Sequence, residues 1–329
     1  MRGVIASLVA AGLVTAQAPA PIRVSVHEVI VPITVVDDKG RFVSDLEQSD
    51  FRIFEDGREQ KIVHFSRERN QPVVVGFLLE MSNSIRMHWK FYQDAAMELI
   101  NVLLPGDKKY SGYLITYGNE AELAANTSHD PEKMLEKIRK MKPGGGASLF
   151  DAVHMALTRR ELVKGEPIEP RRVIVIIGNG DDTASGKRLE EVLELAVRHQ
   201  ATIYGISTTG FGFSSAGDKN LARLAEETGG RVVYPQQGIY KDVSGYLSTP
   251  SDEGNYALKV GTGGYASAIA QAMFRAISDI HGEISTQYII RYIPDQDDTS
   301  RVRREIRVQV NLPPLVKIRH KQYYYPLSP

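Results

Sequence analysis

The sequence has no cysteine, no net charge and no apolar run long enough to cross a membrane comfortably. The lack of cysteine excludes a disulfide framework, a thiolate metal site and a lipid anchor on cysteine. With 40 basic and 40 acidic side chains, the chain has no long-range field that would draw it to nucleic acid. What is present is a chain of 329 residues, which is long enough for two domains and has the apolar content of an ordinary globular protein.

The first residues are typical of a secretory signal peptide. Arg2 supplies a positive charge, and Val4–Val14 is an uninterrupted run of apolar and small residues. Cleavage after Ala16 is favoured over the next small-residue site because that site directly precedes Pro19. We assign residues 1–18 to the signal peptide and expect an exported protein, periplasmic or secreted, with no membrane span after signal removal. The alternatives are a disordered or buried tail and an uncleaved anchor.

Two blocks of β character flank the rest of the chain. Residues 19–69 and 283–329 both alternate apolar and polar side chains, as half-buried strands do. In the first block, the turn Glu55–Arg58 separates the strand candidates Phe51–Phe54 and Ile62–Phe65. Each block is too small to bury a core alone. We therefore predict that the two blocks pair into one small β-sandwich; the alternative is two separate flaps.

Residues 70–282 alternate strand and helix patterns, which predicts a parallel sheet covered by helices on both faces. The strand candidates are Val73–Leu79, Gly112–Tyr117, Val173–Ile177, Ala201–Ser207 and Arg231–Tyr234. The helix candidates are Trp89–Leu104, Pro131–Lys140, Ser148–Thr158, Lys187–His199, Lys219–Thr228 and Ala266–Ile280. Thr208–Asp218 and Gln236–Gly264 are expected to be long loops, which are often functional. Ligands of such a sheet bind beyond the carboxyl ends of its strands.

The most informative stretch is Glu80-Met81-Ser82-Asn83-Ser84, which follows the first apolar strand of this middle region. It places one carboxylate and two hydroxyls at alternate positions of a loop. Carboxylate and hydroxyl oxygens are ligands that Mg²⁺ prefers, and a loop allows them to converge on one point. The layout resembles the Asp-x-Ser-x-Ser signature of von Willebrand factor A domains, with Glu80 in place of the aspartate.

The resemblance covers about residues 71–281 and includes three loops in the expected order. Gly144–Asp151 resembles the family's Gly-Gly-Thr-x-Leu-Tyr-Asp loop, and Gly178–Asp182 stands where the family has Asp-Gly after a strand. The resemblance implies a doubly wound, Rossmann-like α/β domain with a metal-ion-dependent adhesion site, which a partner protein's carboxylate completes. The inferred arrangement is this domain inserted between the N- and C-terminal β segments, with boundaries at residues 19–69, 70–282 and 283–329.

Three departures from the family pattern weaken the implied metal site. Glu80 carries one extra methylene, Ala147 stands at the threonine position and cannot coordinate, and Asn179 replaces an acid. Since affinity rises with the number of charged ligands, we expect no metal or weakly bound Mg²⁺. The candidate ligands of this degenerate site are Glu80, Ser82, Ser84, Ser148, Asn179 and Asp181. The alternative is a vestigial site whose serine hydroxyls only satisfy backbone groups of the loop.

The flanking segments also resemble secreted bacterial VWFA-related proteins, in Val35–Leu46, Asp50–Gly57, Thr286–Tyr292 and Val316–Tyr324. This resemblance implies architecture more than activity. We expect an exported, non-catalytic, adhesion-type binding module with an unidentified protein partner and no nucleic acid. Arg86 and Trp89 are the anchor candidates, because interface hot spots favour Arg and Trp; alternatively, Trp89 only packs the first helix on the sheet.

The alternative function is a secreted hydrolase or other enzyme with an unrecognised site. No Gly-x-Ser-x-Gly, His-Glu-x-x-His or Walker A motif is present in the sequence. A dinucleotide loop at Gly210–Gly212 lacks the third glycine, and a cytoplasmic chelatase-type subunit conflicts with the signal peptide.

Overall fold

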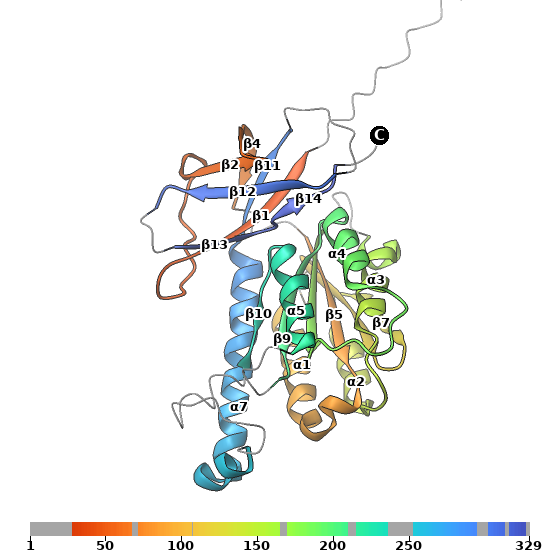
Figure 1. Cartoon of the computed structure of the whole chain (residues 1–329). Helices are drawn as coiled ribbons and strands as arrows, with labels where there is room; N and C mark the ends of the chain where they lie inside the picture. The colour runs from red at the N-terminus through yellow and green to blue at the C-terminus, as the bar shows by residue number, and fades with distance from the viewer. Residues whose placement is uncertain are drawn as a thin grey trace, which may run out of the picture.

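The computed structural model describes residues 28–67, 72–106, 108–164, 170–209, 215–235, 253–294, 302–312 and 316–326. It consists of an α/β domain and a β-sandwich that lies at one end of it (Figure 1). The proposed signal peptide at residues 1–18 lies outside the described residues. Within the described residues, no helix combines the length and apolar character needed to cross a membrane.

The α/β domain is built on one six-stranded sheet with the strand order β10-β9-β8-β5-β6-β7. Its strands are β5 (Val73–Glu80), β6 (Tyr110–Tyr117), β7 (Ala121–Ser128), β8 (Arg171–Gly178), β9 (Thr202–Ser207) and β10 (Val232–Val233). Five strands are parallel, as predicted, and their apolar runs are buried on both faces. The sheet is nevertheless mixed, because β7 pairs antiparallel with β6 at the edge. The sequence analysis did not predict β7.

Helices cover both faces of this sheet, each over its own cluster of buried apolar side chains. One face carries α1 (Trp89–Leu103), α2 (Glu132–Lys140) and α7 (Glu253–Thr286). The other face carries α3 (Leu149–Thr158), α4 (Leu189–Arg198) and α5 (Ala216–Glu227). The described residues also form the short 3₁₀ helices η1 (Gln48–Asp50), η2 (Asn83–His88) and η3 (Arg160–Val163). This is the doubly wound arrangement that the alternating pattern predicted.

The last helix is longer than the sequence indicated. It runs from Glu253 to Thr286, so the second half of the predicted Gln236–Gly264 loop is helical and that part of the prediction is wrong. Four glycines in the first half of this helix, at positions 254, 261, 263 and 264, each disfavour helix by about 1 kcal/mol relative to alanine, and so this half was not predicted. Its second half buries Ile269, Met273, Ile277 and Ile280 in the core beside α1.

The two flanking blocks form one β-sandwich, as predicted. One sheet has the order β13-β1-β11-β4 and the other β14-β12-β2-β3, so each contains strands from both ends of the chain. The N-terminal strands are β1 (Val29–Val36), β2 (Phe51–Glu55), β3 (Arg58–Gln60) and β4 (Ile62–Ser66). The C-terminal strands are β11 (Tyr288–Tyr292), β12 (Arg304–Val310), β13 (Lys317–His320) and β14 (Tyr323–Tyr324). Side chains from both sheets share one buried cluster, which neither block could form alone.

One detail of the predicted hairpin is wrong. Asp56 and Gly57 do form the turn, with φ of 46° and 80°, but the partner of β2 is β3. Ile62–Ser66 crosses to the other sheet and pairs with β11. Glu55, placed in the turn by the sequence, ends β2 and is buried. It forms an ion pair with Arg304 at 2.5 Å, which ties the two ends of the chain together.

The sandwich packs against the end of the α/β domain where the parallel strands begin. Gln287, between α7 and β11, donates hydrogen bonds to Thr34 of the sandwich (3.3 Å) and Tyr204 of β9 (3.1 Å). Fully buried Glu283 near the end of α7 accepts hydrogen bonds from Arg231 and Arg319. The carboxyl ends of the parallel strands therefore lie at the opposite end of the domain.

Candidate functional site

The carboxyl ends of β5 and β8 carry two of the three loops that the sequence singled out, and the segment before α3 carries the third. Backbone hydrogen bonds join the loop after β5 directly to the segment before α3: Asn83 N donates to Gly145 O (3.0 Å) and Gly144 N to Met81 O (2.7 Å). Asn119, after β6, accepts a hydrogen bond from Gly146 N at 2.7 Å. The loops are thus fixed against one another by main-chain contacts.

Glu80 is the centre of the first loop and is completely buried. Its Oε1 accepts hydrogen bonds from the hydroxyls of Ser82 and Ser84, the latter at 2.7 Å. Its Oε2 accepts one from the backbone N–H of Asn179 at 2.7 Å. Burial raises the pKa of Glu80, and these three hydrogen bonds oppose that rise. Both carboxylate oxygens are therefore already engaged within the protein.

Gly178 provides the space for this carboxylate. A Cβ at position 178 would lie 2.6 Å from Glu80 Oε2 and 2.1 Å from the hydroxyl oxygen of Tyr117. Burial, and then the nearby charge of Glu80, raises the pKa of Tyr117 well above its ordinary value. Neither Gly178 nor Tyr117 was singled out from the sequence, because each acts across the sheet on a residue of another strand.

The loop after β8 completes the network. Asn179 Nδ2 donates to Ser84 Oγ and to Asp181 Oδ2, both at 3.1 Å, and Asn179 Oδ1 accepts from Asp181 N at 2.9 Å. The amide thus presents a donor to Ser84 at the position where the family's acid would present an acceptor. Asp182 points elsewhere: it accepts hydrogen bonds from Phe150 N (2.8 Å) and the Ser185 hydroxyl (2.6 Å).

Ser148 is not part of this network. It precedes α3 and is completely buried, and its hydroxyl has no hydrogen-bond partner in the described part of the chain. Ala147 beside it is also buried, and its carbonyl accepts hydrogen bonds from the N–H groups of Thr183 (2.8 Å) and Ala184 (3.0 Å). The structure therefore brings together Glu80 and four of the other candidate ligands, and leaves Ser148 apart.

These residues fit a divalent cation poorly. Glu80 would have to give up hydrogen bonds to coordinate, and Asn179 turns an N–H donor toward the Ser84 oxygen. Within the described residues, no three His, Cys, Asp or Glu side chains gather as a metal-binding group. The donor set has fewer charges than a tight Mg²⁺ site normally has.

The two anchor candidates follow the first loop in the chain. Arg86 is exposed in η2, directly after the first loop. Trp89 is the first residue of α1; it is partly buried and packs against the core beneath that helix. Part of the Trp89 indole is thus buried against the core. The residue follows the exposed Arg86 closely in the chain.

A sequence profile of the von Willebrand factor type A domain family matches residues 75–239, about half of the chain. Among curated proteins, no significant match was found. A similar solved structure is the vWF domain of the type V pili tip protein Mfa5 from Porphyromonas gingivalis, with 19% identity, TM-score 0.32 and coverage of 35% of this chain and 40% of that chain.

Two further similar structures are PilB minor pilin from Streptococcus sanguinis and proximal thread matrix protein 1 from the mussel byssus with a zinc-occupied MIDAS motif. The pilin has 12% identity, TM-score 0.43 and coverage of 66% of this chain and 62% of that chain. The byssus protein has 13% identity, TM-score 0.45 and coverage of 70% of this chain and 49% of that chain. This chain spans less than half of the pili tip and byssus chains.

Proposed function

This chain belongs to the von Willebrand factor type A domain family, and we propose that it is an exported, non-catalytic, adhesion-type module that binds a protein partner. Domains of this family commonly bind proteins. The proposed contact face is the strand-end rim, which comprises residues 80–86, 144–148, 179–182 and 208–218. Of the last segment, residues 210–214 lie outside the described residues.

The network around Glu80 is the observation that carries this proposal. It fixes the loops of the rim in one arrangement before any partner binds, because Glu80 joins the segment after β5 to the backbone after β8. A rigid face loses little conformational entropy on association, which favours binding. With the carboxylate engaged internally, contact with a partner rests on exposed groups such as Asn83 and Arg86.

The surroundings of the rim also favour a large ligand. A cleft of about 780 Å³ lies beside the first loop, between Met81, the β6–β7 turn and the end of α2. Lys137 and Lys140 line it on one side and Glu120 and Glu122 on the other. A polar surface that carries charges of both signs is typical of the periphery of a protein–protein interface.

Partner capture from an envelope extract tests the proposal. We expect Arg86→Glu to weaken capture at least tenfold with an unchanged melting temperature, since the side chain is exposed. The matched control is Arg307→Glu on the exposed face of β12, which should capture normally. Ser82 is a poorer probe, because it is 5% exposed and donates to Glu80, so its loss also affects folding.

Two outcomes would contradict the proposal. Equal capture by the Arg86 and Arg307 variants would move the contact away from the rim. Turnover of a generic ester, peptide or phosphate substrate by the purified protein would favour the enzyme alternative.

Export is tested separately by intact-mass analysis of protein recovered from outside the cytoplasm. We expect loss of the first sixteen to twenty residues, roughly as a signal peptide of this type is cut. Recovery of the full-length chain from the cytoplasm alone would refute it.

A further inference from the structure

A second site lies at the other end of the α/β domain. A cavity of about 360 Å³ lies between the starts of β8 and β9, the ends of α4 and α5, and the β1 and β11 strands of the sandwich. It is separate from the rim, because the rim lies at the carboxyl ends of the same parallel strands. Five basic side chains line it: Arg171, Arg172, Arg198, His199 and Lys321.

The described lining of this cavity is rich in basic side chains. No carboxylate is among its described lining residues. Arg198 has an ion-pair partner, Glu194, at 2.8 Å, which lies on α4 outside the lining. The ends of α4 and α5 bring carbonyl groups near, but a helix C-terminus supplies only a partial negative charge. The described lining of the cavity therefore combines basic side chains with no carboxylate.

Lys321 is the clearest sign of a missing partner. It is 5% exposed, its ammonium nitrogen lies 6.0 Å from the centre of the Tyr324 ring, and the described lining of the cavity offers it no carboxylate. A buried cation without a counter-ion is costly. Burial accordingly lowers its pKa to about 7.

Arg171 adds a second incompletely paired donor. It is 8% exposed, and one terminal nitrogen donates to Ile284 O at 2.5 Å, while its Nε has no partner in the described part of the chain. Two buried basic groups on separate elements, β8 and the β13–β14 connection, thus line one cavity with unused hydrogen-bonding capacity.

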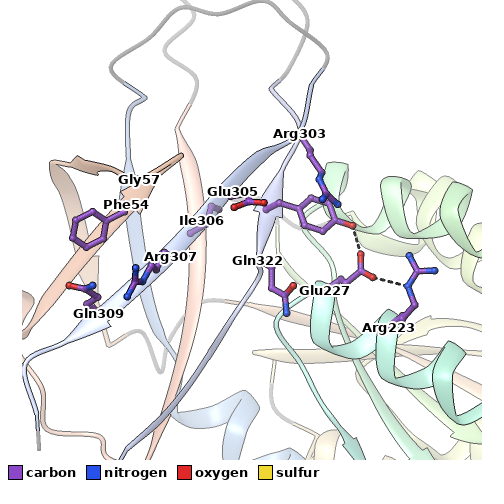
Figure 2. Close-up of a pocket in the computed structure, with 11 residues that line it drawn as sticks. Phe54, Gly57, Arg223, Glu227, Arg303, Glu305, Ile306, Arg307, Gln309 and Gln322 are labelled. Atoms are coloured by element: carbon purple, nitrogen blue, oxygen red, sulfur yellow. Dashed lines mark hydrogen bonds and ion pairs between the residues drawn. The ribbon is translucent and has the colours of Figure 1, made fainter. Parts of the chain in front are cut away.

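Another cleft between the two domains shows the contrast. It measures about 640 Å³ and lies between α5 and the outer face of β12 (Figure 2). There Glu227 accepts hydrogen bonds from Tyr323 at 2.6 Å and Arg223 at 2.9 Å, which are the dashed lines of Figure 2. Arg223 also binds Glu190, and Arg303 lies over the Tyr323 ring. In that cleft, unlike the cavity at Lys321, a lining carboxylate pairs with a lining arginine.

We propose that the cavity at Lys321 binds a small organic anion whose carboxylate or phosphate group pairs with Lys321 and Arg171. Ile30, Pro32 and Ile289 supply an apolar wall for the body of such a molecule. The bound anion would join residues of β8 to the β13–β14 connection and so strengthen the contact between the two domains. This site is independent of the proposed function of the rim.

Calorimetric titration of the full chain with benzoate and phenylphosphate tests the proposal, with benzyl alcohol as the neutral analogue. We expect both anions to bind and the alcohol not to bind. Lys321→Met should weaken anion binding roughly tenfold or more, as loss of a charged hydrogen-bond donor does. Lys317→Met, an exposed lysine on β13, is the matched control and should bind as the wild type does.

The pH dependence supplies a second readout. Benzoate stays ionised above pH 6, so its affinity should fall as Lys321 loses its proton, roughly tenfold for each pH unit above 7. Equal affinity of the Lys321 and Lys317 variants, equal binding of benzyl alcohol and benzoate, or no binding of either anion at millimolar concentration would overturn the proposal.

Discussion

Replacing Lys321 by methionine should stabilise this protein in the absence of an anion. Methionine keeps the unbranched apolar stem and a similar volume, so the packing changes little. The substitution removes an ammonium group that is 5% exposed. The same cavity is lined by Arg171 and Arg172 from β8 and by Arg198 and His199 at the end of α4.

The magnitude follows from the pKa. Lys321 titrates at about 7 in the folded protein against an ordinary value of 10.5. Between these pH values the unfolded chain holds a proton that the folded chain does not, so the free energy of unfolding falls as the pH is lowered from 10.5 to 7. Below pH 7 the loss is constant. At about 1.4 kcal/mol for each pH unit, the full effect is roughly 5 kcal/mol, of which about 1.4 kcal/mol has developed at pH 9.5.

Urea unfolding at pH 7 and at pH 9.5, in chloride buffers without carboxylates or phosphate, measures this effect. We expect Lys321→Met to exceed the wild type in stability by roughly 3 to 5 kcal/mol at pH 7, and by about 1 kcal/mol at pH 9.5. The exposed Lys317→Met control should differ by less than about 0.5 kcal/mol at both values. If Lys321→Met shows the same stability difference at the two pH values, the ammonium is not isolated and the reasoning fails.

Three further substitutions test other parts of the structure. Gly178→Ala places a Cβ 2.6 Å from the Glu80 carboxylate; thermal unfolding should show a loss of roughly 2 to 4 kcal/mol, and an unchanged melting temperature would contradict the geometry. Glu283→Gln leaves Arg231 and Arg319 at the domain junction with a neutral, weaker acceptor. Urea unfolding should show a loss of roughly 3 kcal/mol in the free energy of unfolding. An unchanged free energy of unfolding would mean that solvent compensates the two arginines. The wild type should bind Mg²⁺ in the millimolar range or not at all, and the triple change Glu80→Asp, Ala147→Thr and Asn179→Asp should tighten binding measured by calorimetry; micromolar binding by the wild type would refute the account of the site.

Most of the sheet could be predicted because burial on both faces leaves a plain signal. The sequences of β5 and β8 contain continuous apolar runs, a pattern that is typical of strands buried on both faces of a parallel sheet. β7 was missed because it lies at the edge and its sequence, AELAANTS, is only partly buried and does not alternate clearly. Its place depends on pairing with β6, which a local pattern does not encode.

The sandwich was predicted from a shortage of strands rather than from a pattern. Neither terminal block can bury a core, so pairing between them follows from size alone. The order of its strands could not be predicted in the same way. That Ile62–Ser66 leaves the β2 hairpin to pair with β11 depends on contacts between residues more than 200 positions apart in sequence.

The candidate site shows the same division. The order of the three loops in the sequence predicted that their residues lie together beyond the carboxyl ends of the parallel strands. The direction of the Glu80 carboxylate could not be predicted, because it depends on the missing Cβ of Gly178 on the neighbouring strand. The isolation of Ser148 likewise depends on the local turn before α3.

The interleaved strands of the sandwich have a consequence for how the chain folds. Pairing Ser66 of β4 with Ile289 of β11 closes a loop that contains the whole α/β domain. If that segment were a flexible coil of roughly 220 residues, closing it would cost about 5 kcal/mol in chain entropy, against about 2 kcal/mol for a span of ten residues. A folded α/β domain holds β5 and the end of α7 in place, so only the short connections to β4 and β11 remain to be ordered. Folding of the inserted domain thus reduces the entropic cost of the sandwich by roughly 3 kcal/mol, and damage to either domain should lower the stability of both.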